Sequence, residues 1–372
     1  MITVLIIATA LALLPALNTF VNILLLRRPG LPSGLPRVAI LIPARDEEST
    51  IGACVAAALS SEGADVEVIV LDDGSRDRTR QIVEEYNVRD PRVRIASAPP
   101  LPEGWKGKTH ACQVLSELSS RPFLLFVDAD VRLAPTAAAR LVPPLGIDLV
   151  SAVPRQIVKS VVEISVIPMI NSLIYGYLPV VLMRRLPWEA LTAACGQMIM
   201  VRAEAYRRAG GHRAIAGFMH DGMQLAKSFR RNGFRTDLVD GTSLAHCRMY
   251  NNVSAVFEGF GKNATEGMAR PVALPIWTLL LVGGHLLPLV ALPVGLISGA
   301  SSGPAWVAAL SSAVLLFVAR ILQAVKCREP GEAVALHPLG VVLTLAIQWR
   351  ALLGYLRGRP VEWRGRSYAP TV

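Results

Sequence analysis

The stretch FLLFVDADVRL, residues 123–133, decides the fold class of this chain. Its first five residues form the apolar run of a buried strand, and Asp128 and Asp130 follow with a single alanine between them. Because charge is costly to remove from water, two carboxylates directly after a core strand indicate that the strand ends at a crevice. At such a place they can meet a divalent cation and a phosphate.

Two earlier segments follow the same pattern. RVAILIPA (37–44) and VEVIVLDDGS (66–75) are short apolar runs that end in polar turns, and helices are expected near 48–60 and 77–87. Short strands that alternate with helices predict a parallel sheet with crossover helices. Carboxyl ends of parallel strands share one edge, where ligands bind. A DxD alone is common in caps and turns, but three polar strand ends on one edge predict a functional site.

Composition narrows the class of protein. The chain has 372 residues, of which 52% are hydrophobic and 18% charged, and its net charge is +10. A basic chain suits nucleic acid or an anionic membrane face, and the apolar segments favour the membrane, so no nucleic-acid partner is expected. The 5 cysteines show no CxxC pair or metal-site spacing, which favours reduced thiols in a cytosolic domain.

Several segments are long and apolar enough to enter a bilayer. Residues 2–26 carry no charge and are followed by two arginines, which favours an uncleaved anchor over a cleaved signal peptide, with its carboxyl end in the cytoplasm. Residues 272–298 and 304–325 predict two further spans. The stretch 334–349 is shorter and precedes an arginine-rich tail. We therefore expect it to be re-entrant or interfacial, which keeps that tail in the cytoplasm.

The uncharged stretch 164–183 contains Pro168, Gly176 and Pro179, and predicts a broken amphipathic segment at the bilayer surface. The expected organisation is a multi-pass protein of the cell (inner) membrane whose catalytic domain faces the cytoplasm. Its expected parts are an anchor at 1–28, a catalytic domain at 29–271, membrane helices at 272–357 and a basic cytoplasmic tail at 358–372.

As a set, the motifs resemble glycosyltransferase family 2, whose members have the GT-A fold. The early ones are ILIPARDEEST, VIVLDDGSRDRT, GWKGKTHA and FVDAD, and the later ones are CGQMIMVRAEAYRRAGGH, HDGMQLAKSFRRNGFR, CRMYNNVSAVFEGFGKN and EWRGRSY. The later motifs and the membrane layout are most similar to the bacterial carotenoid (diaponeurosporenoate) group. The resemblance implies an α/β fold with a mixed, mainly parallel sheet, flanking helices, and transmembrane helices at both ends.

The resemblance also implies roles for individual residues. Asp130 would be the principal ligand of Mg²⁺ or Mn²⁺, with Asp128 contacting the cation or the ribose, and Lys108 would face the diphosphate. Asp221 would be the general base that takes the proton of the acceptor hydroxyl. The remaining nucleotide-sugar contacts would come from Pro43, Arg45, Glu47, Asp73 and Gln197.

Five residues carry more than one interpretation each. Family members usually have an acidic residue where this chain has His220, which can orient the base, bind a phosphate, or be a partly exposed histidine. His246 can complete the metal shell or be structural. The tail residues Trp363, Arg364 and Arg366 can close over the diphosphate or anchor the tail at the bilayer surface.

The predicted function is that of an inverting hexosyltransferase, which moves one sugar from a nucleotide sugar to a membrane lipid, with a UDP-sugar as the first donor to consider. The Gln-x-x-Arg-Trp signature of processive synthases is missing, which favours single-sugar transfer. A carotenoid or other terpenoid is the first acceptor to consider, with polyprenyl phosphate, hopanoid and glycerolipid as alternatives. Outside this class stand a non-catalytic nucleotide-binding membrane scaffold and a nucleotidyltransferase, which would release pyrophosphate.

Overall fold

A computed structural model describes residues 2–297, 299, 303–363 and 365–368. Contacts divide the chain into two compact units, which are considered separately. The sheet unit contains residues 26–157 and 181–249. The helical unit contains the described residues of 1–25, 158–180 and 250–372.

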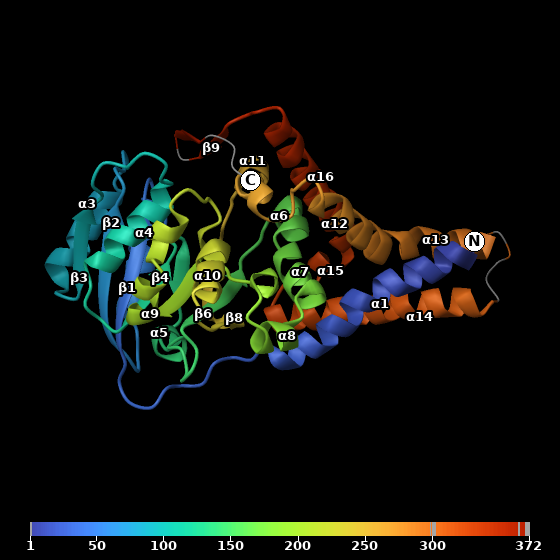
Figure 1. Ribbon diagram of the computed structural model, residues 1–372, viewed down its shortest axis with the longest axis horizontal. Helices are drawn as coiled ribbons and strands as arrows, with labels where there is room; N and C mark the ends of the chain where they lie inside the picture. Colours follow the sequence, from blue (N-terminus) through green and yellow to red (C-terminus); the bar gives the residue numbers. More distant parts are fainter. Residues whose placement is uncertain (1, 298, 300–302, 364, 369–372) are drawn as a thin grey trace. The chain divides into compact units, whose positions relative to one another are not determined.

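The sheet unit is built on one mixed sheet, which within the described residues has 8 strands in the order β3-β2-β1-β4-β7-β6-β8-β5 (Figure 1). Strands β3, β2, β1 and β4 run parallel, and β7 is antiparallel to both of its neighbours, β4 and β6. Strand β8 is parallel to β6 and antiparallel to β5. The strands are β1 (Arg37–Ala44), β2 (Asp65–Asp72), β3 (Val93–Ser97), β4 (Phe123–Val127), β5 (Val131–Leu133), β6 (Leu149–Gln156), β7 (Met198–Arg202) and β8 (Thr236–Cys247).

Helices cover both faces of this sheet, which explains the apolar character of its central strands. Val38, Ile40 and Ile42 of β1 belong to one apolar cluster, while Ala39 and Leu41 belong to the other. The helical elements are α2 (Ile51–Leu59), α3 (Thr79–Arg89), α4 (Gly107–Glu117), α5 (Ala137–Arg140), η1 (Glu189–Leu191), α9 (Ala203–Arg208), η2 (Gly211–Ile215) and α10 (Asp221–Arg231); α8 (Val180–Arg185) begins at the unit boundary. The predicted mixed, mainly parallel α/β sheet with flanking helices is confirmed.

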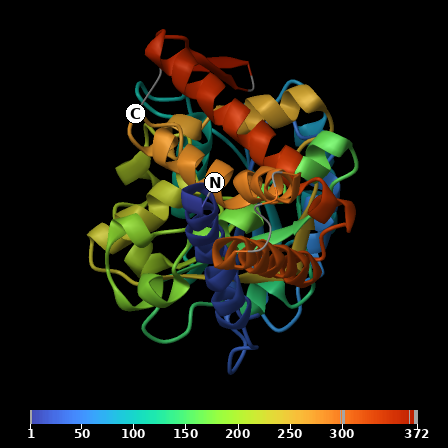
Figure 2. The same cartoon turned by 90° about the vertical axis from the view of Figure 1, so that its right-hand side faces the viewer.

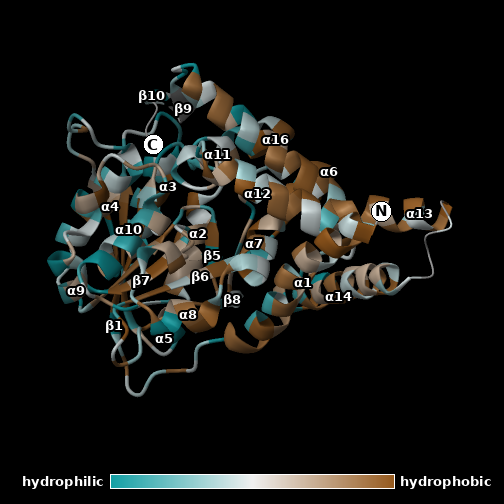
Figure 3. Ribbon diagram, turned by 45° about the vertical axis from the view of Figure 1, so that its right-hand side comes forward, coloured by the Kyte–Doolittle hydropathy of each residue, from teal (hydrophilic) through white to brown (hydrophobic). Residues whose placement is uncertain are grey.

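The helical unit contains four helices long and apolar enough to cross a membrane, counted over the described residues (Figure 3). They are α1 (Ile2–Leu25), the continuous run of α12 (Ala273–Leu281), η4 (Val282–Leu286) and α13 (Leu287–Ile297), α14 (Pro304–Cys327), and α16 (His337–Leu356). The unit also has α6 (Val161–Val166), α7 (Met169–Tyr177), α11 (Val253–Gly261), η3 (Ala264–Glu266), α15 (Glu332–Ala335) and a hairpin of β9 (Val361–Trp363) and β10 (Arg366–Tyr368). These helices confirm the prediction of apolar helices at both ends of the chain.

One segment, 334–349, differs in length from the expectation, and another, 164–183, is broken as expected. The helix expected to be short, 334–349, is a 20-residue helix from His337 to Leu356. The sequence underestimates its length because Arg350 interrupts the apolar run without interrupting the helix. The stretch 164–183 forms three short helices, α6, α7 and α8, with breaks at Ile167–Pro168 and Leu178–Pro179.

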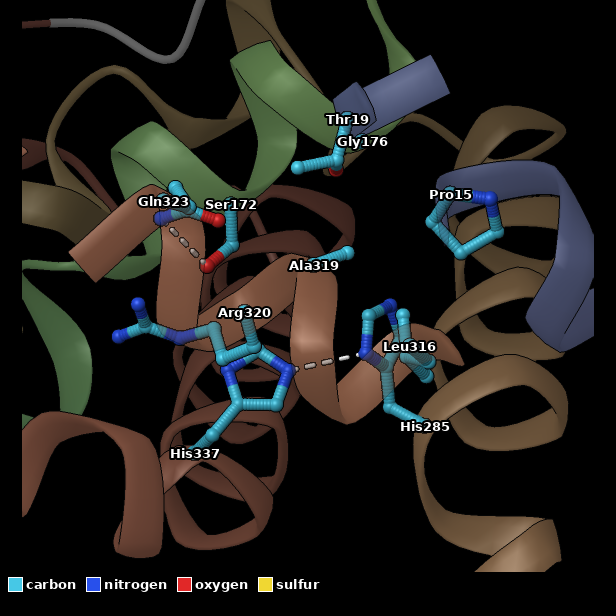
Figure 4. A pocket seen from close by; sticks show the side chains of 10 residues that line it. All are labelled: Pro15, Thr19, Ser172, Gly176, His285, Leu316, Ala319, Arg320, Gln323 and His337. Atoms are coloured by element: carbon cyan, nitrogen blue, oxygen red, sulfur yellow. Dashed lines mark hydrogen bonds between the residues drawn. The ribbon is translucent and has the colours of Figure 1, made fainter. Parts of the chain in front are cut away.

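Inside the helical unit, α1 lies alongside α14 (Figures 1 and 2). A cavity of about 10 Å³ is lined by polar and apolar side chains from α1, α7, η4, α14 and α16 (Figure 4). There His337 Nε2 lies 2.9 Å from His285 Nδ1, and Arg320 pairs with Glu329 at 2.6 Å. A cavity of that size accommodates one water molecule, which suits an internal polar cluster that joins these helices.

Candidate active site

The carboxyl ends of three parallel strands meet at one edge of the sheet. In the β1–β2 register Ala44 lies opposite Asp72, and in the β1–β4 register Leu41 lies opposite Phe126. The polar turns that follow these strands therefore share a rim, which is called the catalytic rim below. The sheet brings together the three motifs that the sequence places far apart.

The turns after β1 and β2 are tied to each other by hydrogen bonds. The Asp73 N–H donates to the Ala44 carbonyl at 2.9 Å, and Arg45 Nη1 donates to the Asp73 carbonyl at 3.0 Å. Arg45 also pairs with the Asp73 carboxylate at 3.8 Å, and the Glu47 N–H donates to Thr79 Oγ1 at 2.7 Å. Arg45, Glu47 and Asp73 thus occupy one connected turn, next to Pro43 at the end of β1.

The turn after β4 carries the two candidate metal ligands. The Asp128 N–H donates to the Gln197 carbonyl at 3.1 Å, and the Val131 N–H closes the turn on the Asp128 carbonyl at 3.0 Å. Asp130 Oδ1 is buried and has no hydrogen-bond partner among the described residues. Burial, followed by the negative charges of Asp128 and Glu47, raises the pKa of Asp130 to about 7.

A buried carboxylate oxygen with no donor is a suitable ligand for a divalent cation, whose charge relieves both desolvation and repulsion. The described residues contain no group of three or more His, Cys, Asp or Glu side chains arranged to hold a metal. Mg²⁺ usually takes one or two carboxylates and completes its shell with water and phosphate oxygens. Asp130 and Asp128 fit a cation of this kind, bound together with a diphosphate.

Lys108 links the acidic turn to the candidate base. Its Nζ lies 2.6 Å from Asp128 Oδ1 and 3.0 Å from Asp221 Oδ2, and it donates to the Gly196 carbonyl at 3.3 Å. Burial opposes the charged form of Lys108. The carboxylates of Asp128 and Asp221 outweigh burial and hold the pKa of Lys108 well above its usual value. Burial raises the pKa of Asp221, yet the positive charge of Lys108 outweighs burial, so this pKa lies below the ordinary value. Asp221 is therefore ionised at neutral pH, as a general base must be.

Two glycines that sequence reasoning did not single out allow α10 to approach this site. A Cβ on Gly222 would lie 2.5 Å from the backbone nitrogen of Gly196. A Cβ on Gly196 would lie 2.7 Å from Asp221 Oδ1. The contact at Gly222 is with backbone and excludes any side chain, so the start of α10 is packed directly on the 195–197 backbone, while a side chain at Gly196 would displace the Asp221 carboxylate. The glycines in CGQ and HDG were the available signals.

A buried histidine behind the base was also missed. His212 Nδ1 lies 2.7 Å from the Tyr206 hydroxyl, and its ring packs against Phe126 with the ring centres 4.8 Å apart. Burial lowers the pKa of His212 to about 4, so the imidazole is neutral. At neutral pH His212 is therefore an uncharged neighbour of Asp221, and Lys108 supplies the positive charge.

Gln197 lies behind the acidic turn. Its Oε1 accepts from Gln156 Nε2 at 2.9 Å, and its Nε2 donates to Cys247 Sγ at 3.0 Å. Only 6% of its surface is exposed. Its backbone carbonyl is the group that holds the Asp128 N–H, so the structure connects Gln197 to the rim through its main chain.

The remaining candidates lie on four further segments of the chain. His220 directly precedes α10, is half-buried, and contributes to the lowered pKa of Asp221. His246 is exposed on β8, opposite Arg132 of β5; burial, then Arg132 and Arg155, lowers its pKa. Trp363 and Arg366 pair across the β9–β10 hairpin of the helical unit. Arg364 lies outside the described residues.

A mixed sheet with an acidic turn after β4 and a carboxylate at the start of α10 defines the GT-A class of nucleotide-sugar folds. Residues 39–210 match the family model of Glycosyl transferase family 2. Over this region, a little under half of the chain, the sequence is similar to that family, as the motifs predicted.

Comparisons with individual proteins agree with this assignment. The chain is 25% identical over 261 residues to a 4,4'-diaponeurosporenoate glycosyltransferase of Staphylococcus haemolyticus, covering 66% of each chain. It is 26% identical over 241 residues to the Staphylococcus aureus protein of the same name, covering 62% of this chain and 61% of the relative. The matches thus span slightly less than two thirds of these relatives. In fold it is similar to the Pyrobaculum calidifontis mannosyltransferase, with a TM-score of 0.53, 17% identity, and coverage of 94% of this chain and 99% of the other.

Proposed function

We propose that this chain is a membrane-bound inverting glycosyltransferase that moves a single sugar from a nucleotide sugar, first of all a UDP-sugar, to a lipid acceptor. The observation that carries the proposal is the arrangement of Lys108, which lies between the acidic turn at Asp128 and the ionised Asp221. A site for a diphosphate with its cation and a site for a base are thereby neighbours. Transfer of a sugar from a diphosphate to a hydroxyl requires both.

Each side chain of the site has its own role in the proposed reaction. Asp221 accepts the proton of the acceptor hydroxyl while that oxygen attacks the anomeric carbon from the face opposite the diphosphate, which inverts the configuration. The connected turn of Arg45 and Asp73 binds the nucleoside side of the donor. Asp130 and Asp128 would hold Mg²⁺ or Mn²⁺, which supplies neutralisation of the diphosphate leaving group. Lys108 adds a point positive charge beside that group.

The membrane requirement follows from the solubility of the two substrates. A charged sugar donor stays in the cytosol, whereas a lipid acceptor stays in the bilayer, so the enzyme has to work where they meet. The four long apolar helices support a multi-pass protein of the cell membrane with the catalytic rim on the cytoplasmic side. The names of the staphylococcal relatives support a carotenoid or other terpenoid acceptor. Polyprenyl phosphate, hopanoid and glycerolipid are the acceptors to compare.

The test is release of nucleoside diphosphate by the detergent-purified protein, with UDP- and GDP-sugars, Mg²⁺ or Mn²⁺, and a membrane lipid extract. We expect release from one donor that requires lipid and is lost in Asp221→Asn and Asp130→Ala. Glu204→Gln is the matched control, because its side chain is 80% exposed and lies on α9. Release of pyrophosphate would indicate a nucleotidyltransferase instead. Donor binding without product in either the native or the Asp221→Asn protein would indicate a scaffold.

A further inference from the structure

The sheet unit displays a large aromatic side chain on a loop that the catalytic rim does not use. This segment, residues 182–189, runs from the last turn of α8 to the start of η1 and is called the Trp188 loop below. Trp188 is 60% exposed and Leu182 is 45% exposed, and Arg185 between them is also exposed. Exposed apolar side chains that occur together with basic ones mark contact surfaces more often than exposed single residues do.

A buried arginine fixes the backbone of this loop. Arg230 on α10, only 6% exposed, donates to the carbonyls of Met183 at 2.7 Å, Leu186 at 2.9 Å and Trp188 at 3.2 Å. Its Nε donates to Thr236 Oγ1 at 2.8 Å. Hydrogen bonds from a charged donor contribute more than neutral ones, so the loop is held in one conformation. The tryptophan is thus presented to the surroundings by a rigid support.

The first residues after α1 are attached to the same strand as the Trp188 loop. Arg184 Nε donates to Asp237 Oδ1 of β8 at 2.8 Å. The Asp240 N–H, three residues further along β8, donates to the Arg27 carbonyl at 3.1 Å, and Arg28 pairs with the Asp240 carboxylate at 3.6 Å. At about 3.3 Å per residue, these two attachments are about 10 Å apart.

The end of α1 bears on the level at which residues 27 and 28 lie. Helix α1 ends at Leu25, and its apolar length is sufficient to cross a bilayer. Residues 27 and 28 follow within two or three positions and therefore lie at the level of the lipid headgroups. The Trp188 loop is attached to β8 about 10 Å from the attachment of these residues, a distance comparable with the headgroup layer, several ångströms thick on each side of the hydrocarbon, plus the length of the side chains that would enter it.

We propose that the Trp188 loop is a bilayer contact of the sheet unit, with Trp188 and Leu182 among the headgroups of anionic phospholipids. Tryptophan is enriched at this level of the membrane, and arginines near the surface are attracted to anionic lipids. Arg27, Arg28 and Arg185 are all exposed and supply that charge. The contact is independent of sugar transfer and would attach the sheet unit itself to the bilayer.

The test uses the full chain in nanodiscs, with an environment-sensitive NBD label on a cysteine introduced at Ala190, next to the loop. The matched control is the same label at Val88, which is 85% exposed on α3. Protein without an introduced cysteine gives the background, which will be low because four of the native thiols are buried. Brominated phosphatidylcholine, with and without phosphatidylglycerol, serves as the quencher.

We expect severalfold stronger quenching at 190 than at 88, increased by phosphatidylglycerol and reduced by Trp188→Ser. Equal quenching at the two positions would overturn the proposal. A blue-shifted label at 190 that brominated lipid does not quench would also overturn it, because that result indicates a protein partner or a second copy of the chain. Circular dichroism and nucleotide binding of Trp188→Ser show whether the variant is folded.

Discussion

Replacing Lys108 with methionine separates two roles that this residue can have. The substitution keeps most of the side-chain volume and removes the charge that lies 2.6 Å from Asp128 and 3.0 Å from Asp221. If Lys108 mainly sets the charge of the base, its loss will raise the pKa of Asp221. If it only binds the donor diphosphate, its loss will raise the KM for the donor and leave the pKa of the base unchanged.

The expected size of the shift follows from the distance and the exposure. Two unit charges about 3 Å apart interact by about 5 kcal/mol at an effective dielectric constant of about 20. The Lys108 side chain is 35% exposed, so solvent screening reduces this value; we use about 2 kcal/mol. At about 1.4 kcal/mol per pKa unit, the pKa of Asp221 should rise by about one to two units.

The assay measures kcat/KM for nucleoside diphosphate release between about pH 4.5 and pH 8.5, and the pH at which activity is lost is compared with the ordinary pKa of a carboxyl group. In the native protein the depressed pKa keeps Asp221 ionised well into acid, so the loss of activity occurs at low pH. In Lys108→Met the acid limb should move upward by the shift given above, and Lys108→Arg should restore part of it. Lys159→Met, at an exposed lysine, is the control. An unmoved acid limb with a raised donor KM would refute the reasoning.

Three further outcomes are expected. Asp130→Asn should raise the melting temperature in EDTA, and the increase should grow from pH 5 to pH 7. The reason is that a carboxyl whose pKa is raised in the folded state destabilises the fold as pH increases. A pH-independent difference in differential scanning fluorimetry would contradict this. Gly222→Ala should lower the free energy of unfolding by more than about 2 kcal/mol and abolish transfer, because its Cβ would lie 2.5 Å from the Gly196 nitrogen. A Cβ at Gly331 would meet open space, so Gly331→Ala should behave as native in both assays. Iodoacetamide should leave Cys54 unmodified at pH 8, because burial raises the pKa of its thiol to about 12; rapid labelling detected by mass spectrometry would show that the core opens.

Much of the site was predictable because its residues follow strands. Apolar runs of five to eight residues that end in aspartate placed Asp73, Asp128 and Asp130 on one edge of a parallel sheet before any pairing was known. Family motifs then added Lys108 and Asp221. What the motifs did not contain was the contact between these last two residues, which are more than a hundred positions apart in the chain and meet only because α4 and α10 lie on the same rim.

The sequence by itself determined the class of the fold, the apolar helices and the strand ends that carry charge, because hydrophobic periodicity records which faces are buried. Only the tertiary structure decided that β7 runs antiparallel between β4 and β6, that the Gln197 amide lies in a buried network, and that Arg230 holds the Trp188 loop. Each of these depends on atoms brought together from distant positions. The local sequence pattern does not predict such pairs, because their energy depends on packing and burial, which exist only after the chain has folded.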